Sequence, residues 1–413
     1  MIEIPVLDVR LHGRSVGALT RLGGDKIIFS FNDDYIADTA RPTLSLSFKA
    51  ASGEIITDLK PTQTRLPPFF SNLLPEGAMR DYLARQANVK SEREFYLLWV
   101  LGQDLPGALK IVPLHGGALP PGISSSDQGA AGHVTFAPAQ EKDMMRFSLA
   151  GVQLKFSAIQ EARGGLTIPA NGVGGSWIVK LPSMVFRGVP ENEFAMMELA
   201  RRVGIDVPEN HLVPVSQIRG LPQGMAAMGE AALAVKRFDR AESGAAVHME
   251  DFAQVFGVYP EEKYARASYR NLAEVLWIEI GERGIAEFIR RLVFNALIGN
   301  GDMHLKNWSL LYPDGRHAQL APAYDFVSTI SYIADDRLAL TLVDSKAFGD
   351  VSAEQFARFA NKAALPEKLS RDVVRDTVAR FRKVWPKSTD IDMPSGVRET
   401  INGHLAKVPL WRA

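Results

Sequence analysis

Alternating hydrophobic and polar positions dominate the start of the chain. Ile27-Ile28-Phe29 follows a Gly23-Gly24-Asp25 turn, and apolar residues alternate with serines over Leu44–Phe48. A period of two between turn residues predicts β-strands at both places. The Pro67-Pro68 pair ends this pattern, and short helices are expected after it.

A helical period appears later in the chain. Apolar residues recur at three- and four-residue intervals from Ile285 to Leu297, and Gly299 follows. This stripe predicts a helix that faces the core and ends near that glycine. The same spacing predicts helices over Glu191–Val203 and Pro366–Lys387.

The order of these elements predicts an α+β fold with two lobes. Short apolar runs at Ser176–Leu181 and Ala232–Val235 indicate strands, and a segment rich in Gly, Pro and Ser precedes them. We therefore expect a β-rich amino-terminal domain, a linker, a small lobe and an all-helical C-terminal lobe. The predicted boundaries are 1–112, 113–135, 136–260 and 261–413.

Composition narrows the class of protein. The 413 residues are 46% hydrophobic and 23% charged, with 47 basic and 47 acidic side chains. Such a chain is expected to fold without staples and not to act as a polybasic nucleic-acid binder. The absence of cysteine excludes disulfides, thiolate metal sites and cysteine nucleophiles. No signal peptide or long apolar run is evident, so we expect a cytoplasmic protein without membrane contact.

The segment Asn300–Asn307 holds the most informative polar residues. Asp302 and Asn307 are five residues apart, which is the D-x-x-x-x-N spacing of protein-kinase catalytic loops. In such a loop the carboxylate orients a hydroxyl group and the amide oxygen holds a magnesium ion. A pair of this kind standing alone is more often a helix cap or a solvated loop. The interpretation therefore depends on other residues.

Two further residues favour phosphate chemistry. Asp325 follows a predicted short strand and turn at Leu320–Pro322, and its carboxylate could ligate Mg²⁺. Lys180 ends an apolar run, and because an unpaired buried charge is costly, it should meet a carboxylate or a phosphate. The alternative for Lys180 is a strand-end lysine that reaches solvent. Candidate partners on the next predicted helix are Glu191, Glu193 and Glu198.

Three other segments are weaker indications. Small residues in Ser148–Lys155 would let backbone N–H groups approach phosphates, but the segment matches no standard phosphate-loop motif. Lys236–Arg240 follows a strand and could be a hinge or plain surface charge. Pro366–Lys387 carries seven basic and three acidic side chains, which could contact DNA phosphates or simply form a solvated helix face.

Together these segments resemble the HipA family, the serine/threonine kinase toxins of bacterial toxin–antitoxin modules. The resemblance covers nearly the whole chain and implies a kinase-like body with ATP and Mg²⁺ bound between a β-rich and a helical lobe. The matching segments are, in order, Phe70–Pro75, Ser148–Lys155, Ile178–Pro182, Glu191–Glu193, Val235–Arg240, Gly301–Asn307 and Tyr324-Asp325.

The resemblance also implies roles for individual residues. Asp302 would be the catalytic aspartate, Asn307 and Asp325 would hold Mg²⁺, and autophosphorylation of Ser148 would switch the kinase off. Implied partners are a HipB-like helix-turn-helix antitoxin, operator DNA through that antitoxin, and a protein substrate such as an aminoacyl-tRNA synthetase. The residues implied to bind ATP are Ala150, Gly151, Val152, Gln153, Leu154, Lys155, Lys180, Lys236, Arg237, Phe238, His304, Leu305, Lys306, Asn307, Tyr324 and Asp325.

Two other functions stay open. Gly301–Asn307 is also similar to aminoglycoside kinases, which favours a small-molecule phosphotransferase, but those enzymes carry a further acidic residue where Val327 stands. A non-catalytic co-repressor that binds an antitoxin would be expected to have lost Asp302, Asn307 or Asp325. Departures from the family pattern are Met303, where glycine is usual, and Leu154, where glutamate is common.

Overall fold

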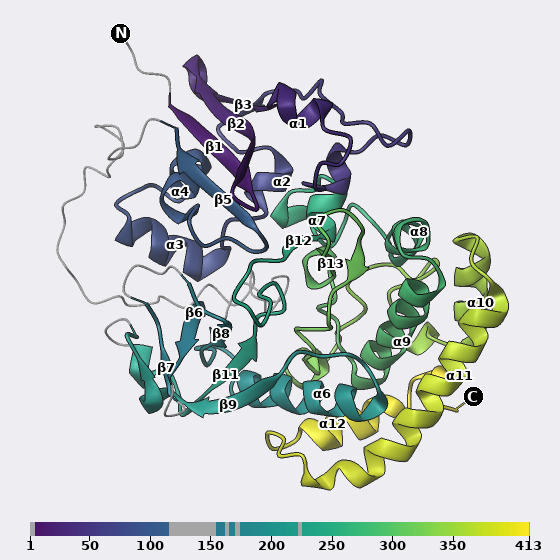
Figure 1. Ribbon diagram of the computed structural model, residues 1–413. Helices are drawn as coiled ribbons and strands as arrows, with labels where there is room; N and C mark the ends of the chain where they lie inside the picture. The colour runs from purple at the N-terminus through teal and green to yellow at the C-terminus, as the bar shows by residue number, and fades with distance from the viewer. Residues whose placement is uncertain (1–4, 115–153, 162–164, 170–173, 222–224, 413) are drawn as a thin grey trace.

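The chain builds three sheets and gathers most of its long helices after residue 250 (Figure 1). The computed structural model describes residues 5–114, 154–161, 165–169, 174–221 and 225–412, and these sheets belong to that part of the chain. The mixed composition of strands and helices confirms the predicted α+β class.

The amino-terminal region is a five-stranded antiparallel sheet covered by short helices. His12 and Gly13 both have positive φ, which closes a tight hairpin between the first two strands. Its strands, in spatial order, are β4 (Thr62–Gln63), β3 (Lys26–Phe31), β2 (Arg14–Leu22), β1 (Val6–Leu11) and β5 (Leu109–Pro113). Its helices are α1 (Asp33–Ala37), α2 (Pro68–Ser71), α3 (Gly77–Gln86) and α4 (Glu94–Leu101).

The strand predicted over Leu44–Phe48 is wrong, because Leu46–Phe48 forms a 3₁₀ turn. The Ser45 hydroxyl accepts a hydrogen bond from the Ser47 N–H and donates one to the buried Glu250 carboxylate, 205 residues along the chain. A distant polar contact therefore decides the local conformation against the alternating pattern.

The second sheet positions two lysines side by side. Lys180, on the inner strand β8, lies directly opposite Lys155 on the neighbouring strand. Helix α6 (Val189–Val203) packs against this sheet. The strands are, in spatial order, β10 (Ile218–Arg219), β7 (Leu166–Thr167), β6 (Lys155–Gln160), β8 (Trp177–Lys180), β11 (Ala231–Lys236) and β9 (Asn210–Pro214).

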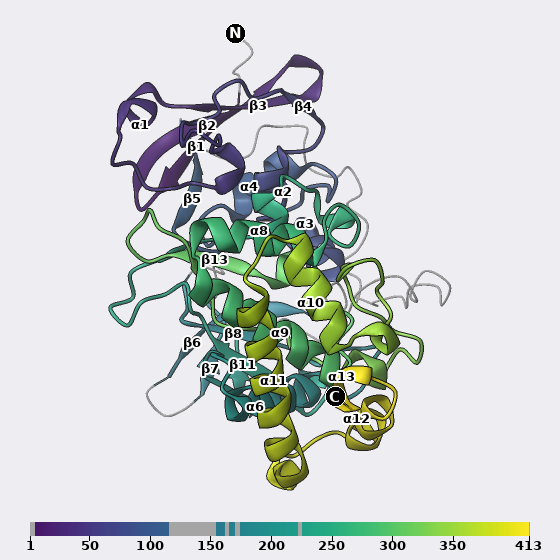
Figure 2. The same cartoon turned by 90° about the vertical axis from the view of Figure 1, so that its right-hand side faces the viewer.

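The C-terminal region is built around α9 (Glu282–Ile298). Its predicted stripe is confirmed, since Ile285, Phe288 and Leu292 are all buried, and Gly299 ends the helix in the left-handed conformation. Figure 2 shows α10 and α11 lying across the same region, and α11 contacts α9. The remaining helices are α7 (Phe252–Val255), α8 (Tyr269–Glu279), α10 (Ala353–Lys362), α11 (Glu367–Val384), α12 (Val397–Leu405) and α13 (Pro409–Arg412).

The prediction of an all-helical C-terminal lobe is wrong. Strands β13 (Ser309–Tyr312) and β14 (Gln319–Leu320) lie within it, and β13 pairs with β12 (His248–Asp251). Leu310 and Tyr312 are fully buried, so the short apolar run Ser309–Tyr312 is a core strand. Periodicity over four residues cannot separate such a strand from a helix turn.

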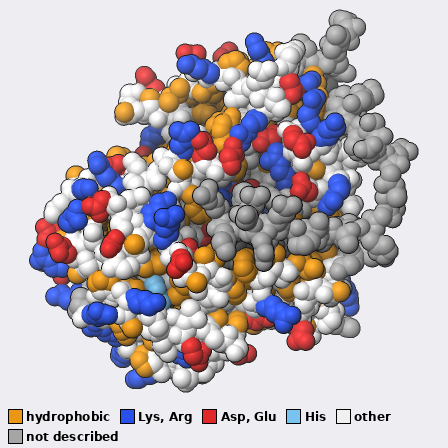
Figure 3. Space-filling model, turned by 180° about the vertical axis from the view of Figure 1, so that it is seen from behind, with side chains coloured by type: hydrophobic (Ala, Val, Ile, Leu, Met, Phe, Trp, Pro, Cys, Tyr) orange, Lys and Arg blue, Asp and Glu red, His pale blue; other side chains and the backbone are white. Residues whose placement is uncertain are grey.

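The basic residues of α11 are largely neutralised within the helix. Basic and acidic side chains are interspersed over the described surface on the face seen in Figure 3. Within α11, four basic residues form ion pairs one turn away. This arrangement favours the solvated-face interpretation of the helix over direct DNA contact. The pairs are Lys368–Asp372, Arg371–Glu367, Arg375–Asp372 and Arg380–Asp376. In the described part of the chain, every helix is too short or too polar to cross a bilayer.

Candidate active site

The loop 300–307, here called the Asp302 loop, is fixed by its own polar groups. The Asn300 amide donates to the Asn295 side-chain oxygen at 2.8 Å, and its own oxygen accepts the Asp302 N–H at 3.0 Å. The Gly301 N–H donates to the Thr329 hydroxyl at 2.7 Å. Because α9 is buried, these bonds place the loop at a defined position at its end.

Gly301 leaves no room for a side chain, because a Cβ there would overlap the Asp336 carboxylate, which is itself held by Thr329. We expect Gly301→Ala to cost about 1–3 kcal/mol of unfolding free energy, as overpacking typically does. Urea denaturation measures this cost. Gly349→Ala is the matched control, since a Cβ at Gly349 meets nothing within 4 Å. Equal stability of the two variants would contradict the expectation.

Asp302 is a buried carboxylate with one firm hydrogen bond. The Tyr264 hydroxyl donates to its Oδ1, and the His304 Nε2 lies 3.9 Å from the same oxygen. Burial raises the pKa of Asp302 to about 7, although the bond from Tyr264 lowers it. A carboxylate with a pKa near neutrality can accept a proton from a substrate hydroxyl and release it again.

His304 and Asn307 complete the loop. His304 Nδ1 accepts the Lys306 N–H at 3.2 Å, so the proton of the neutral ring is on Nε2, which is buried and has no hydrogen-bond partner among the described residues. Burial holds the pKa of His304 well below its ordinary value. The Asn307 amide nitrogen donates to the Asp302 carbonyl at 2.8 Å, which leaves the amide oxygen as the atom that can ligate a cation.

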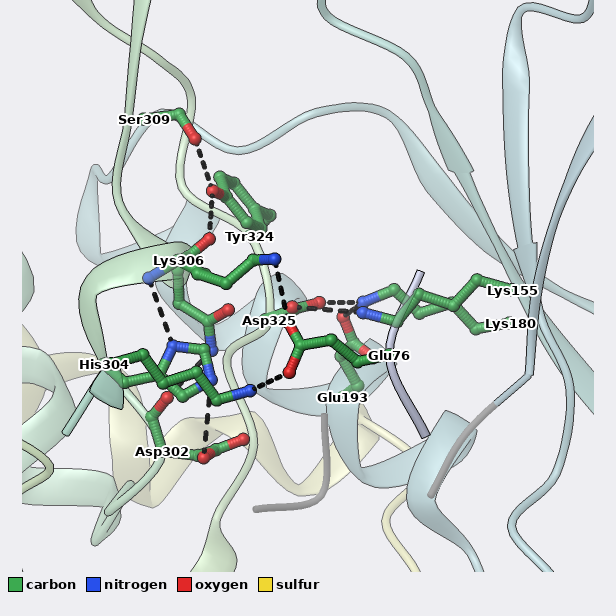
Figure 4. Close-up of polar contacts among 12 residues, drawn as sticks. Glu76, Lys155, Lys180, Glu193, Asp302, His304, Lys306, Ser309, Tyr324 and Asp325 are labelled. Atoms are coloured by element: carbon green, nitrogen blue, oxygen red, sulfur yellow. Dashed lines mark hydrogen bonds and ion pairs between the residues drawn. The ribbon is translucent and has the colours of Figure 1, made fainter. Parts of the chain in front are cut away.

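Asp325 connects the C-terminal region, to which it belongs, with the second sheet (Figure 4). Its two carboxylate oxygens accept hydrogen bonds from Lys180 and, at 3.3 Å, from Lys155, both on the second sheet. Like charges directly opposite one another on adjacent strands repel, so this pair requires an anion nearby. Burial would raise the pKa of Asp325, but the two ammonium groups outweigh it and hold that pKa far below its usual range.

The prediction that Lys180 meets a carboxylate is confirmed. Its side chain is only 6% exposed and also donates to Glu193 on α6. Burial would lower the pKa of Lys180, but Asp325 and Glu193 together raise it above the ordinary value. Lys180 is therefore an ammonium group held at the end of the inner strand β8, where it contacts Asp325 of the C-terminal region.

The carboxylate and amide oxygens at this site suit a magnesium ion that takes most of its ligands from phosphates and water. Among the described residues no group of three acidic or histidine side chains could enclose a metal ion. One carboxylate and one amide oxygen are nevertheless what Mg²⁺ takes from a protein when phosphates and water supply the rest. Asp325 and Asn307 have the right chemistry for this.

The predicted hinge residues have different environments. Lys236 is half exposed and pairs with Glu209 at 3.0 Å, whereas the ring of Phe238 lies 5.5 Å from that of Tyr324. The buried Arg237 guanidinium is bonded to Asp239 at 2.8 Å and to a carboxylate of the amino-terminal region. Arg237 thus ties the second sheet to that region, and its guanidinium is not available to a nucleotide.

The remaining predicted residues are placed as follows. Tyr324 donates to the Lys306 carbonyl at 2.9 Å, and Leu305 is fully buried. Both residues therefore anchor the Asp302 loop to the rest of the C-terminal region. Leu154 is buried next to Lys155. Ser148, Ala150, Gly151, Val152 and Gln153 lie outside the described residues.

Three side chains at this site, Tyr264, Glu76 and Lys263, were not predicted from the sequence. Tyr264 bonds Asp302, and Glu76 of the amino-terminal region pairs with Lys263 at 2.7 Å and with Lys306 at 2.8 Å. No local pattern singles them out, because each acts on a partner distant in sequence. Glu76 directly follows Phe70–Pro75, one of the segments that carry the family resemblance.

Comparisons with known proteins cover both halves of the chain. Residues 7–112 match the family model described as HipA N-terminal domain, and residues 147–385 match HipA-like C-terminal domain. The chain is 53% identical over 416 residues to the Putative kinase Y4dM of Sinorhizobium fredii, covering 100% of this chain and 99% of that protein.

A HipA sequence and a HipA structure from Shewanella oneidensis are also similar to this chain. The Serine/threonine-protein kinase toxin HipA is 27% identical over 380 residues, which cover 84% of this chain and 83% of that protein. A solved structure of HipA with HipB and its operator DNA has the same fold, with a TM-score of 0.71, 21% identity, and coverage of 98% of this chain and 96% of that one. With family matches over both halves and a relative alike along its full length, this chain belongs to the HipA family.

Proposed function

We propose that this protein is a serine/threonine protein kinase toxin that uses ATP and Mg²⁺. The observation that carries the proposal is the contact of Lys180 and Lys155 with Asp325 across the two lobes. Cations from one lobe and a carboxylate from the other are the groups that phosphoryl transfer requires around a nucleotide. The name of the relative, kinase toxin, supports the same conclusion.

Each residue then has a role that its surroundings support. Bound ATP–Mg²⁺ would supply the phosphoryl group. Asp302 orients the hydroxyl of the substrate and takes its proton, since its pKa of about 7 suits a base at neutral pH. Asn307 and Asp325 hold the cation, and Lys180 and Lys155 neutralise phosphate charge.

The regulatory partners are also part of the proposal. The solved relative is a complex of HipA, HipB and operator DNA. We infer a HipB-like helix-turn-helix antitoxin for this chain, with DNA bound through it. The internal ion pairs of α11 support this indirect route, because that helix has few unpaired basic groups to offer. The substrate is a cellular protein, such as an aminoacyl-tRNA synthetase.

Labelling tests the activity directly. Purified protein, ATP labelled on its γ-phosphate and a cell lysate should give label on one or a few polypeptides, in a reaction that requires Mg²⁺. Label on aminoglycosides or sugars instead would identify a small-molecule phosphotransferase. If no acceptor gains label, the kinase proposal is wrong, and the non-catalytic co-repressor becomes the better interpretation.

Autophosphorylation of Ser148 is the second expected result. The resemblance implies that Ser148 belongs to the phosphate loop, where a phosphate would add up to about two negative charges beside those of the nucleotide and repel ATP. Mass spectrometry after incubation with ATP should find phosphate on Ser148 and a falling rate of substrate labelling. Substrate labelled to completion with Ser148 unmodified would contradict this off-switch.

A further inference from the structure

Glu76 belongs to the amino-terminal region, but its side chain lies beside the Asp302 loop of the C-terminal region (Figure 4). It stands at the N-cap of α3, but its side chain makes no capping bond to its own helix. Instead, its two oxygens lie 2.7 Å from Lys263 Nζ and 2.8 Å from Lys306 Nζ. The Glu76 carboxylate is therefore engaged with two lysines of the C-terminal region and not with its own helix.

Both lysines are attached to the Asp302 loop. Lys306 belongs to the loop itself, and the Lys263 carbonyl accepts the Leu305 N–H at 3.3 Å. Lys306 Nζ also donates to the Asn72 carbonyl at 3.1 Å, a second contact with the amino-terminal region. The position of the loop is therefore linked to the position of α3.

Charge explains why the carboxylate matters. The lysine side chains are only 6% and 15% exposed, and two such cations close together repel one another. Burial would raise the pKa of Glu76, but Lys306 and Lys263 hold it far below the usual value, so the carboxylate stays ionised. Without it, both lysines would have to move apart or toward water, and the loop would move with them.

We propose that Glu76 is a positioning residue for phosphoryl transfer, supplied by the amino-terminal domain, which holds the Asp302 loop through Lys263 and Lys306. The effect on catalysis rests on the proposed kinase function, whereas the effect on the loop does not. A small displacement of a reacting group can cost about 10²-fold in rate.

Another ion pair across the same boundary provides a matched control. Arg65 of the amino-terminal region forms two bonds with Glu261, of 2.5 and 2.8 Å, and Glu261 contacts no residue of the Asp302 loop in the described structure. Glu261→Gln therefore removes an interdomain carboxylate without touching the loop, whereas Glu76→Gln removes the one that holds it.

Hydrogen exchange and kinetics test the proposal together. In Glu76→Gln, amide exchange over residues 302–308 should speed up, and kcat should fall about 10- to 100-fold with KM for ATP changed less than about threefold. Glu76→Asp, which keeps the charge, should recover part of kcat. Glu261→Gln should match the wild type in both measurements. Unchanged exchange in Glu76→Gln, or equal losses in Glu261→Gln, would overturn the proposal.

A combined variant separates positioning from general destabilisation. If Glu76 acts through the two lysines, Glu76→Gln added to Lys263→Met and Lys306→Met should be no slower than the variant that lacks both lysines. Multiplied losses would contradict the proposal. If the wild type transfers no phosphate, the kinase function fails, and the exchange rates alone decide whether Glu76 holds the loop.

Discussion

Asp302→Asn should lower the kcat of phosphoryl transfer by about 10²–10⁴-fold, which is the usual contribution of a general base. The amide keeps the size of the side chain and can still accept the bond from Tyr264, so the loop should stay in place. ATP binding should be nearly unchanged, because Asp302 acts on the acceptor hydroxyl. Single-turnover transfer and equilibrium nucleotide binding measure the two effects separately.

The pH dependence of kcat/KM gives a second, independent test of Asp302 as the general base. Its pKa is raised to about 7 by burial, so the fraction in the basic form rises through pH 7 and levels off above it. The kcat/KM of the wild type should therefore fall as the pH is lowered below about 7, and the residual activity of Asp302→Asn should lack this limb. A variant as active as the wild type would end the assignment. Asp314→Asn, at an exposed turn, is the control.

Asp325→Asn should weaken magnesium-dependent nucleotide binding by at least about 10- to 100-fold, the range seen when only a hydrogen-bond partner of a metal ligand is changed. Asp325 has a φ of 57°, in the left-handed region that asparagine tolerates well, so this substitution changes the charge with little backbone strain. The loss of charge also leaves the facing lysines with less compensation.

Calorimetry with and without Mg²⁺ isolates the metal contribution of Asp325. The wild type should bind ATP much more tightly with the cation, whereas Asp325→Asn should bind it nearly equally in both conditions. Retained magnesium-dependent affinity in the variant would remove Asp325 from the metal site. Thermal unfolding of both proteins excludes a simple loss of structure.

Elements could be predicted from the sequence where the pattern of apolar and charged residues lies within one continuous segment. The stripe of α9 spans four turns, and the lysine at the end of β8 had to meet a charge because burial without one is costly; both expectations are confirmed. The five-residue spacing of Asp302 and Asn307 also places both in one turn-rich loop at the end of α9. The roles of these residues remain predictions.

Other elements depend on contacts that a local pattern does not contain. The strand at Ser309–Tyr312 exists because β12, about 60 residues earlier, offers it a partner, and the 3₁₀ turn at Leu46–Phe48 exists because of Glu250. Glu76 and Tyr264 were missed for the same reason. Tyr264 meets Asp302, 38 residues away, only in the folded C-terminal region, and Glu76 meets its lysines only when the amino-terminal region packs against that region.

The bridge from Lys155 and Lys180 to Asp325 has a consequence for how a nucleotide enters. Both oxygens of that carboxylate are already taken by amines of the opposite lobe. Each oxygen keeps a free lone pair, but the two ammonium groups repel an incoming cation, so we expect at least one amine to move away from Asp325 first. Association should then be limited by an internal opening event rather than by collision, and its rate should level off as the nucleotide concentration rises.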